Sequence, residues 1–261
     1  MHNFLRFEDV SYVRNGVTIL DKCTFTLNSG ESLAILGRNG AGKTTLINLL
    51  YGYFWPTSGR IFVSGEEYGT TPIKPIQDTI GILQSNHQDQ LLQKSLSSTE
   101  VIITGIHRTL GLYKPVTEND LDLAYKALAS IQMEAKADQK FSTLSSGEKS
   151  KILLLRALGI GIKLLILDEP TAALDFTARY HLEKSMEMIK NANPNLTRIL
   201  ITHRVEEIPE DFHKVMLLKE GKILSYGDKD DVLTKESLSD LYELELDLKK
   251  ISQRFFISGI R

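Results

Sequence analysis

One stretch of the chain has the residue types and the spacing to hold phosphate groups. It fits the pattern of a glycine, four further residues and then Gly-Lys-Ser/Thr. Its glycines let backbone N–H groups curl around phosphate oxygens where a Cβ would collide. Lys43 places a positive charge on the outer phosphates, and the Thr44 hydroxyl can bind Mg²⁺. The stretch predicts a nucleotide site formed by Gly37, Arg38, Asn39, Gly40, Ala41, Gly42, Lys43, Thr44 and Thr45.

A second group with chemical capacity is a pair of carboxylates. Residues 164–167 are apolar and are followed by Asp168 and Glu169. A buried strand that ends in two carboxylates delivers them to the sheet edge where ligands bind. Asp168 suits Mg²⁺, directly or through water, and Glu169 suits the orientation of an attacking water. The alternative is a strand that stops at a solvated acidic pair, and the phosphate pattern earlier in the chain favours the catalytic interpretation.

The elements around the phosphate pattern are those needed to position it. Residues 33–36 form an apolar run and residues 45–50 have a helical pattern, which predicts strand, loop and helix with the positive helix end at the anion. Residues 4–27 alternate like two strands around an Asn15-Gly16 turn signal. This opening predicts a small antiparallel sheet ahead of the nucleotide core.

The rest of the chain predicts a mixed α/β fold. Ser97 to Glu100 and Thr117 to Asp120 each open a helical pattern. Residues 164–167 and 199–201 are short apolar runs typical of buried parallel strands. We expect an α/β domain over residues 1–261: a mostly parallel core with the antiparallel sheet (1–90 and 159–228), an inserted helical subdomain (91–158) and a helical C-terminal tail (229–261).

Composition excludes several classes of protein. The chain has 261 residues, a net charge of −2 and a sequence pI near 6.3, so we expect no general attraction to nucleic acid or to anionic membranes. Cys23 is the only cysteine, which excludes an intrachain disulfide and favours a reducing compartment. The most apolar stretch, 152–167, is interrupted by Arg156 and Lys163, so membrane association would need a partner.

Five further features together resemble the ATP-binding-cassette (ABC) ATPases. Residues 144–148, Leu-Ser-Ser-Gly-Glu, resemble the Leu-Ser-Gly-Gly-Gln signature of that family. Four other residues resemble, in chain order, the aromatic residue that stacks on adenine, the Q-loop glutamine, the D-loop aspartate and the switch histidine: Tyr12, Gln84, Asp175 and His203. Their order and separations agree with the family over nearly the whole chain. The resemblance implies a P-loop nucleoside-triphosphatase fold.

Each of these residues also has an ordinary structural interpretation. Tyr12 suits a half-buried strand position, His203 suits a strand end, and Gln84 alone carries no information. Asp175 suits a helix cap three residues before Ala178. The joint match along the chain favours the functional roles.

Two positions depart from the family pattern. Ser146 stands where the signature has its first glycine, and Glu148 stands where it has glutamine. The resemblance assigns the main γ-phosphate contacts to Ser145 and Gly147, which are kept. The departures therefore bear on affinity or rate.

The resemblance implies a mechanism with two partners. ATP on the phosphate loop of one subunit is covered by Ser145 and Gly147 of a second copy or a homologous cassette, in a head-to-tail dimer. Lys43 holds the phosphates, while Thr44, Asp168 and Gln84 position Mg²⁺. The resemblance thus counts Lys43 and Gln84 among the catalytic residues. Glu169 acts on the water and His203 on the γ-phosphate, while Asp175 contributes from the D-loop.

The resemblance also implies a role in transport. We expect a separate membrane permease to dock near Gln84–Leu92, with the chain at the cytoplasmic face of the membrane. Residues 101–106 and 111–113 look like importer subunits for metals and metal chelates, including molybdate- and siderophore-type systems. The alternative is a stand-alone soluble ABC ATPase. Ribosome-associated members carry two cassettes and DNA-repair members carry long coiled coils, and neither feature is found in this sequence.

Overall fold

The computed structural model describes residues 3–84 and 95–260, in two compact units. Unit 1 comprises Met1–Ile80 and Thr197–Arg261, and unit 2 comprises Gly81–Leu196. The limits of these two units differ from those of the subdomains expected from the sequence. The division into subdomains therefore stays a prediction. The segment after Gln84 that is predicted to lie near a permease, through Leu92, falls outside the described residues.

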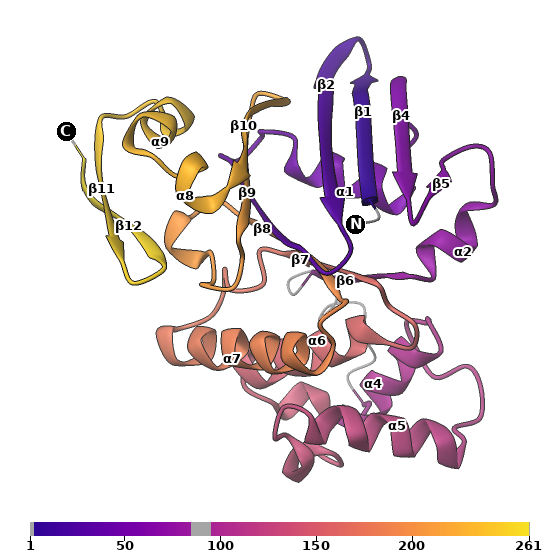
Figure 1. Ribbon diagram of the computed structural model, residues 1–261. Helices are drawn as coiled ribbons and strands as arrows, with labels where there is room; N and C mark the ends of the chain where they lie inside the picture. The colour runs from indigo at the N-terminus through magenta and orange to yellow at the C-terminus, as the bar shows by residue number, and fades with distance from the viewer. Residues whose placement is uncertain (1–2, 85–94, 261) are drawn as a thin grey trace. The chain divides into compact units, whose positions relative to one another are not determined.

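Unit 1 contains the antiparallel sheet predicted from the opening residues (Figure 1). Asn15 and Gly16 both have positive φ, 51° and 76°, as a two-residue hairpin turn requires, and they bring Arg14 opposite Val17. Phe7 and Phe25 stack across the pair inside the core. The sheet has the order β2-β1-β4-β5, with β1 (Asn3–Arg14), β2 (Val17–Asn28), β4 (Ser58–Val63) and β5 (Glu66–Glu67).

A second sheet of unit 1 brings two segments that the sequence analysis singled out to one edge. Strand β3 (Ser32–Leu36) lies parallel to both β8 (Thr197–Thr202) and β9 (Lys214–Lys219), and β10 (Lys222–Asp228) pairs antiparallel with β9. Both β3 and β8 are buried at every residue, as their apolar runs predict. Because Leu36 pairs with Thr202, the segments that follow β3 and β8 start side by side.

The C-terminal tail is only partly helical, so the prediction for 229–261 is wrong in its second half. Helices α8 (Lys229–Val232) and α9 (Lys235–Tyr242) are followed by a hairpin of β11 (Leu246–Ile251) and β12 (Arg254–Ile260). The charges of this segment suggested solvated helices. Leu246 on β11 and Phe255 on β12 are instead buried. Ser252, between the two strands, has a φ of 55°. Unit 1 also contains the helices α1 (Lys43–Tyr51) and α2 (Ile73–Gln77) and the short 3-10 helix η3 (Val205–Glu207).

Unit 2 contains two neighbouring strands and a group of packed helices. Strands β6 (Ile80–Gln84) and β7 (Leu164–Asp168) are hydrogen-bonded neighbours, although Ile80 itself is counted in unit 1. The helices predicted at Ser97 and Thr117 are confirmed, and each begins with a capping box. In Figure 1, α4 contacts α5 and α6, and α6 contacts α7. These helices are α4 (Ser98–Ile106), α5 (Glu118–Ala129), α6 (Ser146–Leu158) and α7 (Phe176–Ala192).

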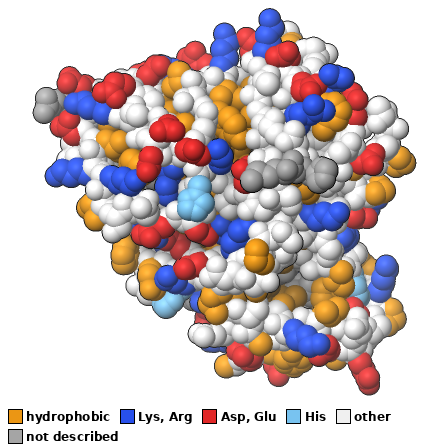
Figure 2. Space-filling view, viewed as in Figure 1, with side chains coloured by type: hydrophobic (Ala, Val, Ile, Leu, Met, Phe, Trp, Pro, Cys, Tyr) orange, Lys and Arg blue, Asp and Glu red, His pale blue; other side chains and the backbone are white. Residues whose placement is uncertain are grey.

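The surface carries charges of both signs. On the face shown in Figure 2, Lys and Arg side chains are interspersed with Asp and Glu side chains, in keeping with the net charge of −2. Among the residues that the structure describes, no helix has the length and apolar character needed to cross a bilayer.

Candidate nucleotide site

The phosphate loop joins β3 to α1, which confirms the predicted strand, loop and helix. Gly42 is the N-cap of α1, with a φ of 102°, and a Cβ there would lie 2.8 Å from Leu20 Cδ2. An L-residue adopts such a φ only with strain, so glycine is required at this point. The loop residues Arg38, Asn39 and Gly40 are exposed. Their backbone is therefore accessible to an anion.

Lys43 is turned into its own loop. Its side chain is buried, at 7% exposure, and its Nζ donates to the carbonyl oxygens of Gly37 and Arg38 at 2.7 and 3.0 Å. The ammonium therefore lies against the first half of the loop. Thr44, the next residue, is exposed in the first turn of α1, where helix N–H groups favour an anion.

Tyr12 is one member of an aromatic pair. Its ring stacks on Phe54 with 5.3 Å between centroids and only 1° between ring planes, and the Arg14 guanidinium lies 6.0 Å from the Phe54 centroid. Tyr12 is half-buried, as its ordinary structural interpretation expects. One face of the ring is covered by Phe54, which the sequence analysis did not single out. Its only signal was an aromatic cluster at residues 51–55.

His203 follows β8 directly, so it starts from the same sheet edge as the phosphate loop. The Gly37 N–H donates to the Thr202 carbonyl at 3.4 Å, which ties the two segments together. His203 is half-buried, and its carbonyl accepts a hydrogen bond of 3.0 Å from the Tyr242 hydroxyl. The structure thus brings together the loop and the predicted switch histidine within unit 1.

In unit 2 the structure joins the predicted Q-loop glutamine to the first carboxylate. Gln84 Nε2 donates to Asp168 Oδ2 at 3.0 Å, at the ends of the neighbouring strands β6 and β7. Glu169, the next residue, has a φ of 45°, which is uncommon outside glycine and is typical of strained functional positions. All three side chains are half-buried.

These oxygen donors suit Mg²⁺, which is commonly held by one or two carboxylates together with water and substrate phosphates. In the described part of the chain, no group of three His, Cys, Asp or Glu side chains forms a metal cluster. A magnesium ion held by Asp168 and Gln84 would take its further ligands from water and the nucleotide phosphates.

The signature segment starts helix α6 with a side-chain cap. Ser145 is the N-cap: its Oγ accepts from the Glu148 N–H at 3.3 Å and donates to Glu148 Oε2 at 3.0 Å. Glu148 also pairs with Lys136 at 2.8 Å. This lysine, with the N–H of Ser145, holds the pKa of the Glu148 carboxyl below its ordinary value. The carboxylate at the family's glutamine position is thus neutralised by a neighbour.

The starts of α6 and α7 lie against each other. A Cβ on Gly147 would lie 2.7 Å from the Ala178 Cβ, so glycine permits this close approach. Asp175 caps α7 by accepting from the Ala178 N–H at 2.7 Å. Its capping role is therefore confirmed, and its D-loop role stays a prediction. Ser145, Ser146 and Asp175 are exposed.

The predicted residues thus fall into two sets, each described within its own unit. The set in unit 1 is the phosphate loop with Tyr12 and His203, and the set in unit 2 is Gln84, Asp168, Glu169, Ser145, Gly147 and Asp175. The sequence analysis missed Phe54, Lys136 and Tyr242 as neighbours of these residues. Their contacts join positions distant in the chain, for which the sequence offers no spacing signal.

Comparison with known proteins agrees with this arrangement. Residues 20–172 match the protein family described as ABC transporter. The chain is 34% identical to the ABC transporter ATP-binding protein YlmA of Bacillus subtilis (strain 168), over 97% of this chain and 96% of that protein. It is 27% identical to the molybdate import ATP-binding protein MolC of Haemophilus influenzae, over 94% and 90% of the two chains.

A solved structure is similar over nearly the full length. It is an inward-facing ABC transporter assigned to the metal-chelate type, and the comparison covers 98% of this chain and 96% of that chain. The TM-score is 0.79 and the sequence identity is 26%. The fold and the sequence therefore point to the same group of proteins.

Proposed function

Because the chain belongs to the ATP-binding proteins of ABC transporters, a family of ATPases, we propose that it powers the import of a metal or a metal chelate. The similarity to a molybdate import protein and to a metal-chelate type transporter supports this substrate class. The resemblance of residues 101–106 to importer subunits supports it as well. In this role the chain lies at the cytoplasmic face of the membrane and is held there by a separate permease.

The residues of unit 1 bind the nucleotide in this proposal. Adenine stacks on the face of Tyr12 opposite the one that Phe54 covers. The loop N–H groups and Lys43 bind the phosphates, and the ammonium then exchanges its carbonyl partners for phosphate oxygens. His203 contacts the γ-phosphate from the same sheet edge.

The residues of unit 2 supply the groups for hydrolysis. Asp168 and Gln84 would hold a magnesium ion, which supplies charge neutralisation for the phosphates. Glu169 orients or deprotonates the attacking water. Glu169 directly follows Asp168 in the chain, and its φ of 45° is an uncommon conformation for a residue other than glycine.

The site is completed by a second copy of the chain or a homologous cassette. Ser145 and Gly147 start α6 with the serine exposed, so a partner's nucleotide can reach this helix start. ATP then joins two subunits head to tail, and hydrolysis releases them. This exposed, intact helix start on a chain that also carries the phosphate loop is the observation that carries the proposal.

The replacement of Glu169 by glutamine tests the mechanism. We expect Glu169→Gln to retain ATP binding, to lose at least about 100-fold in kcat because the base is absent, and to accumulate an ATP-bound dimer. The measurements are nucleotide binding, phosphate release and sedimentation with ATP. Wild-type hydrolysis in this variant would overturn the role of Glu169, and a monomer with bound ATP would overturn the shared site.

Transport itself is tested by recovery of the partner. Affinity purification of the full chain from detergent-solubilised cells should recover a polytopic membrane protein. Recovery of ribosomes or soluble factors instead would favour the alternative of a stand-alone ABC ATPase with a mechanochemical or regulatory role.

A further inference from the structure

The end of helix α9 contacts both nucleotide-binding segments of unit 1. Two consecutive residues make these contacts. Tyr242 reaches the backbone of His203, and Glu243 reaches Arg38 in the phosphate loop. Neither residue belongs to a motif found in the sequence. Their contacts span 39 and 205 positions in the chain.

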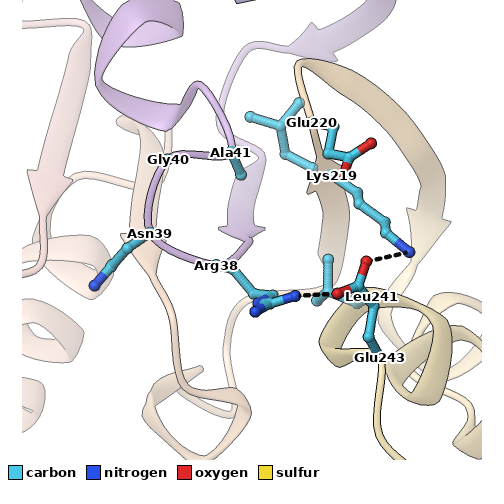
Figure 3. Close-up of a pocket in the computed structure, with 9 residues that line it drawn as sticks. Arg38, Asn39, Gly40, Ala41, Lys219, Glu220, Leu241 and Glu243 are labelled. Atoms are coloured by element: carbon cyan, nitrogen blue, oxygen red, sulfur yellow. Dashed lines mark hydrogen bonds and ion pairs between the residues drawn. The ribbon is translucent and has the colours of Figure 1, made fainter.

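Glu243 bridges the phosphate loop to strand β9. Its Oε2 lies 2.5 Å from Arg38 Nη1, and its Oε1 lies 3.4 Å from Lys219 Nζ (Figure 3). Lys219 is itself held by Asp240 at 2.8 Å. The Arg38 guanidinium, followed by Lys219, holds the pKa of the Glu243 carboxyl below its ordinary value, so the carboxylate is charged at neutral pH.

Tyr242 holds the backbone at the predicted switch histidine. Its hydroxyl donates to the His203 carbonyl at 3.0 Å. Burial raises the pKa of this phenol, so it remains a protonated donor. A donor fixed at the carbonyl of His203 limits rotation of the peptide that follows this residue.

The two contacts arise from a firmly anchored helix end. Leu238 and Leu241 of α9 are fully buried, and Glu243 ends the helix at a φ of 58° while its N–H donates to the Ser239 carbonyl. A pocket of about 190 Å³ separates the first half of the phosphate loop from this end, and Glu243 lines it together with Arg38. The loop therefore reaches α9 mainly through the Arg38 side chain.

We propose that Tyr242 and Glu243 are positioning residues for ATP hydrolysis, which hold the His203 segment and the phosphate loop in the geometry that binds nucleotide. Arg38, Asn39 and Gly40 are exposed, and the Lys43 ammonium holds the Gly37 and Arg38 carbonyls. When Lys43 turns to the phosphates these contacts are lost, and the ion pair of Arg38 with Glu243 remains to order this half of the loop. A loop that is already ordered binds ATP without an ordering cost. The role of Tyr242 rests on the proposed function of His203, whereas the role of Glu243 rests on the phosphate loop alone.

Positioning and simple electrostatics predict opposite effects at Glu243. Removal of a negative charge near the loop favours an anionic ligand, so a purely electrostatic effect of Glu243→Gln lowers the KM for ATP. If Glu243 positions the loop, Glu243→Gln raises the KM for ATP, because the loop must then be ordered when ATP binds. For an exposed ion pair we expect the KM to rise about two- to fivefold, with little change in kcat.

The charge-matched control is Glu245→Gln, an exposed glutamate two residues further along the chain. It should leave both constants unchanged. A double-mutant cycle with Arg38→Ala should show that loss of Arg38 removes most of the effect of Glu243→Gln. A KM that is unchanged or lowered in Glu243→Gln, or fully additive effects in the cycle, would overturn the role of Glu243.

Tyr242→Phe tests the positioning role of Tyr242. It removes one hydrogen bond to a neutral carbonyl and should lower kcat about two- to tenfold while the KM for ATP stays within about twofold. Thermal unfolding is measured in parallel to verify that the variant is folded, and His203→Ala is the reference. A wild-type kcat in Tyr242→Phe overturns the positioning role of Tyr242 if His203→Ala is inactive. A wild-type kcat in His203→Ala overturns the proposed role of the histidine instead.

Discussion

The phosphate loop and the signature segment both lead into a helix, but they begin it in different ways. At the phosphate loop the N-cap is Gly42, in a left-handed conformation and with no side-chain cap. At the signature the N-cap is Ser145, in an extended conformation, and its hydroxyl is engaged by Glu148. The loop thus presents backbone groups that an anion can approach directly. The signature serine must exchange a carboxylate partner before it can contact a phosphate.

This comparison shows where glycine is required. In the loop, Gly42 is required by its backbone conformation. In the signature, Gly147 is required by the close approach of Ala178, and Ser146 occupies the first helical position without a positive φ. The departure from the family pattern at position 146 is therefore accommodated by ordinary helix geometry.

The largest effect is expected at Gly42. Gly42→Ala forces an L-residue to a φ of 102° and places its Cβ against Leu20, so we expect a destabilisation of about 1–3 kcal/mol and loss of measurable ATP binding. The matched control is Gly65→Ala, in the β4–β5 turn, where φ is 86° and no atom lies within 4 Å of the added Cβ. It should lower the unfolding temperature and leave ATP affinity intact. Equal ATP affinities in the two variants would contradict the requirement at Gly42.

The next effect is expected at Gly147. Gly147→Ala drives the starts of α6 and α7 apart, so we expect a loss of about 1–3 kcal/mol in stability and a lower kcat, while the phosphate loop still binds ATP. Ala178→Gly removes the opposing Cβ and should restore part of the rate in the double variant. Phosphate release and nucleotide binding are measured separately. A double variant no better than Gly147→Ala would show that the contact with Ala178 is not the cause.

Much of the fold could be predicted because its signals are local. The capping boxes at Ser97 and Thr117 and the turn at Asn15-Gly16 each depend on residues within a few positions of one another. The apolar runs of β3 and β8 are likewise continuous. The β11–β12 hairpin was missed because many charges lie in residues 229–250, whereas β12 is mostly apolar with Arg254 as its one charged residue, and this change of pattern was not used.

For the candidate site, the motif residues could be predicted from the sequence, but the residues that contact them could not. The motif residues could be found because a family pattern constrains them in the sequence. The residues that hold them could not, since Glu243 meets Arg38 only after the tail has folded back, and Phe54 meets Tyr12 only across the end of α1. Glu148 belonged to a recognised motif, but its partner Lys136 has no spacing rule that predicts it.

A smaller effect is expected at Glu148. Because its pKa is lowered in the folded chain, its ion pair with Lys136 stabilises the fold above the ordinary carboxyl pKa, and this stability is lost as the pH falls through the lowered value. Glu148→Gln keeps a side chain able to complete the cap and removes the ion pair, at a cost of about 0.5 kcal/mol at neutral pH. Unfolding followed from neutral to acidic pH should show the two proteins converging in stability. A constant difference would contradict the ion pair as its source.

The smallest effect is expected at Ser146, and it tests the comparison most directly. Ser146→Gly restores the family's signature residue, but the serine is exposed and lies in the first turn of α6. We therefore expect kcat within about twofold of the wild type, and a loss of a few tenths of a kcal/mol because glycine is the poorer helix former. Steady-state hydrolysis and thermal unfolding check both values. A large rise in kcat would mean that the Cβ of Ser146 obstructs the partner's nucleotide, and that the signature requires glycine for assembly even though its own helix does not.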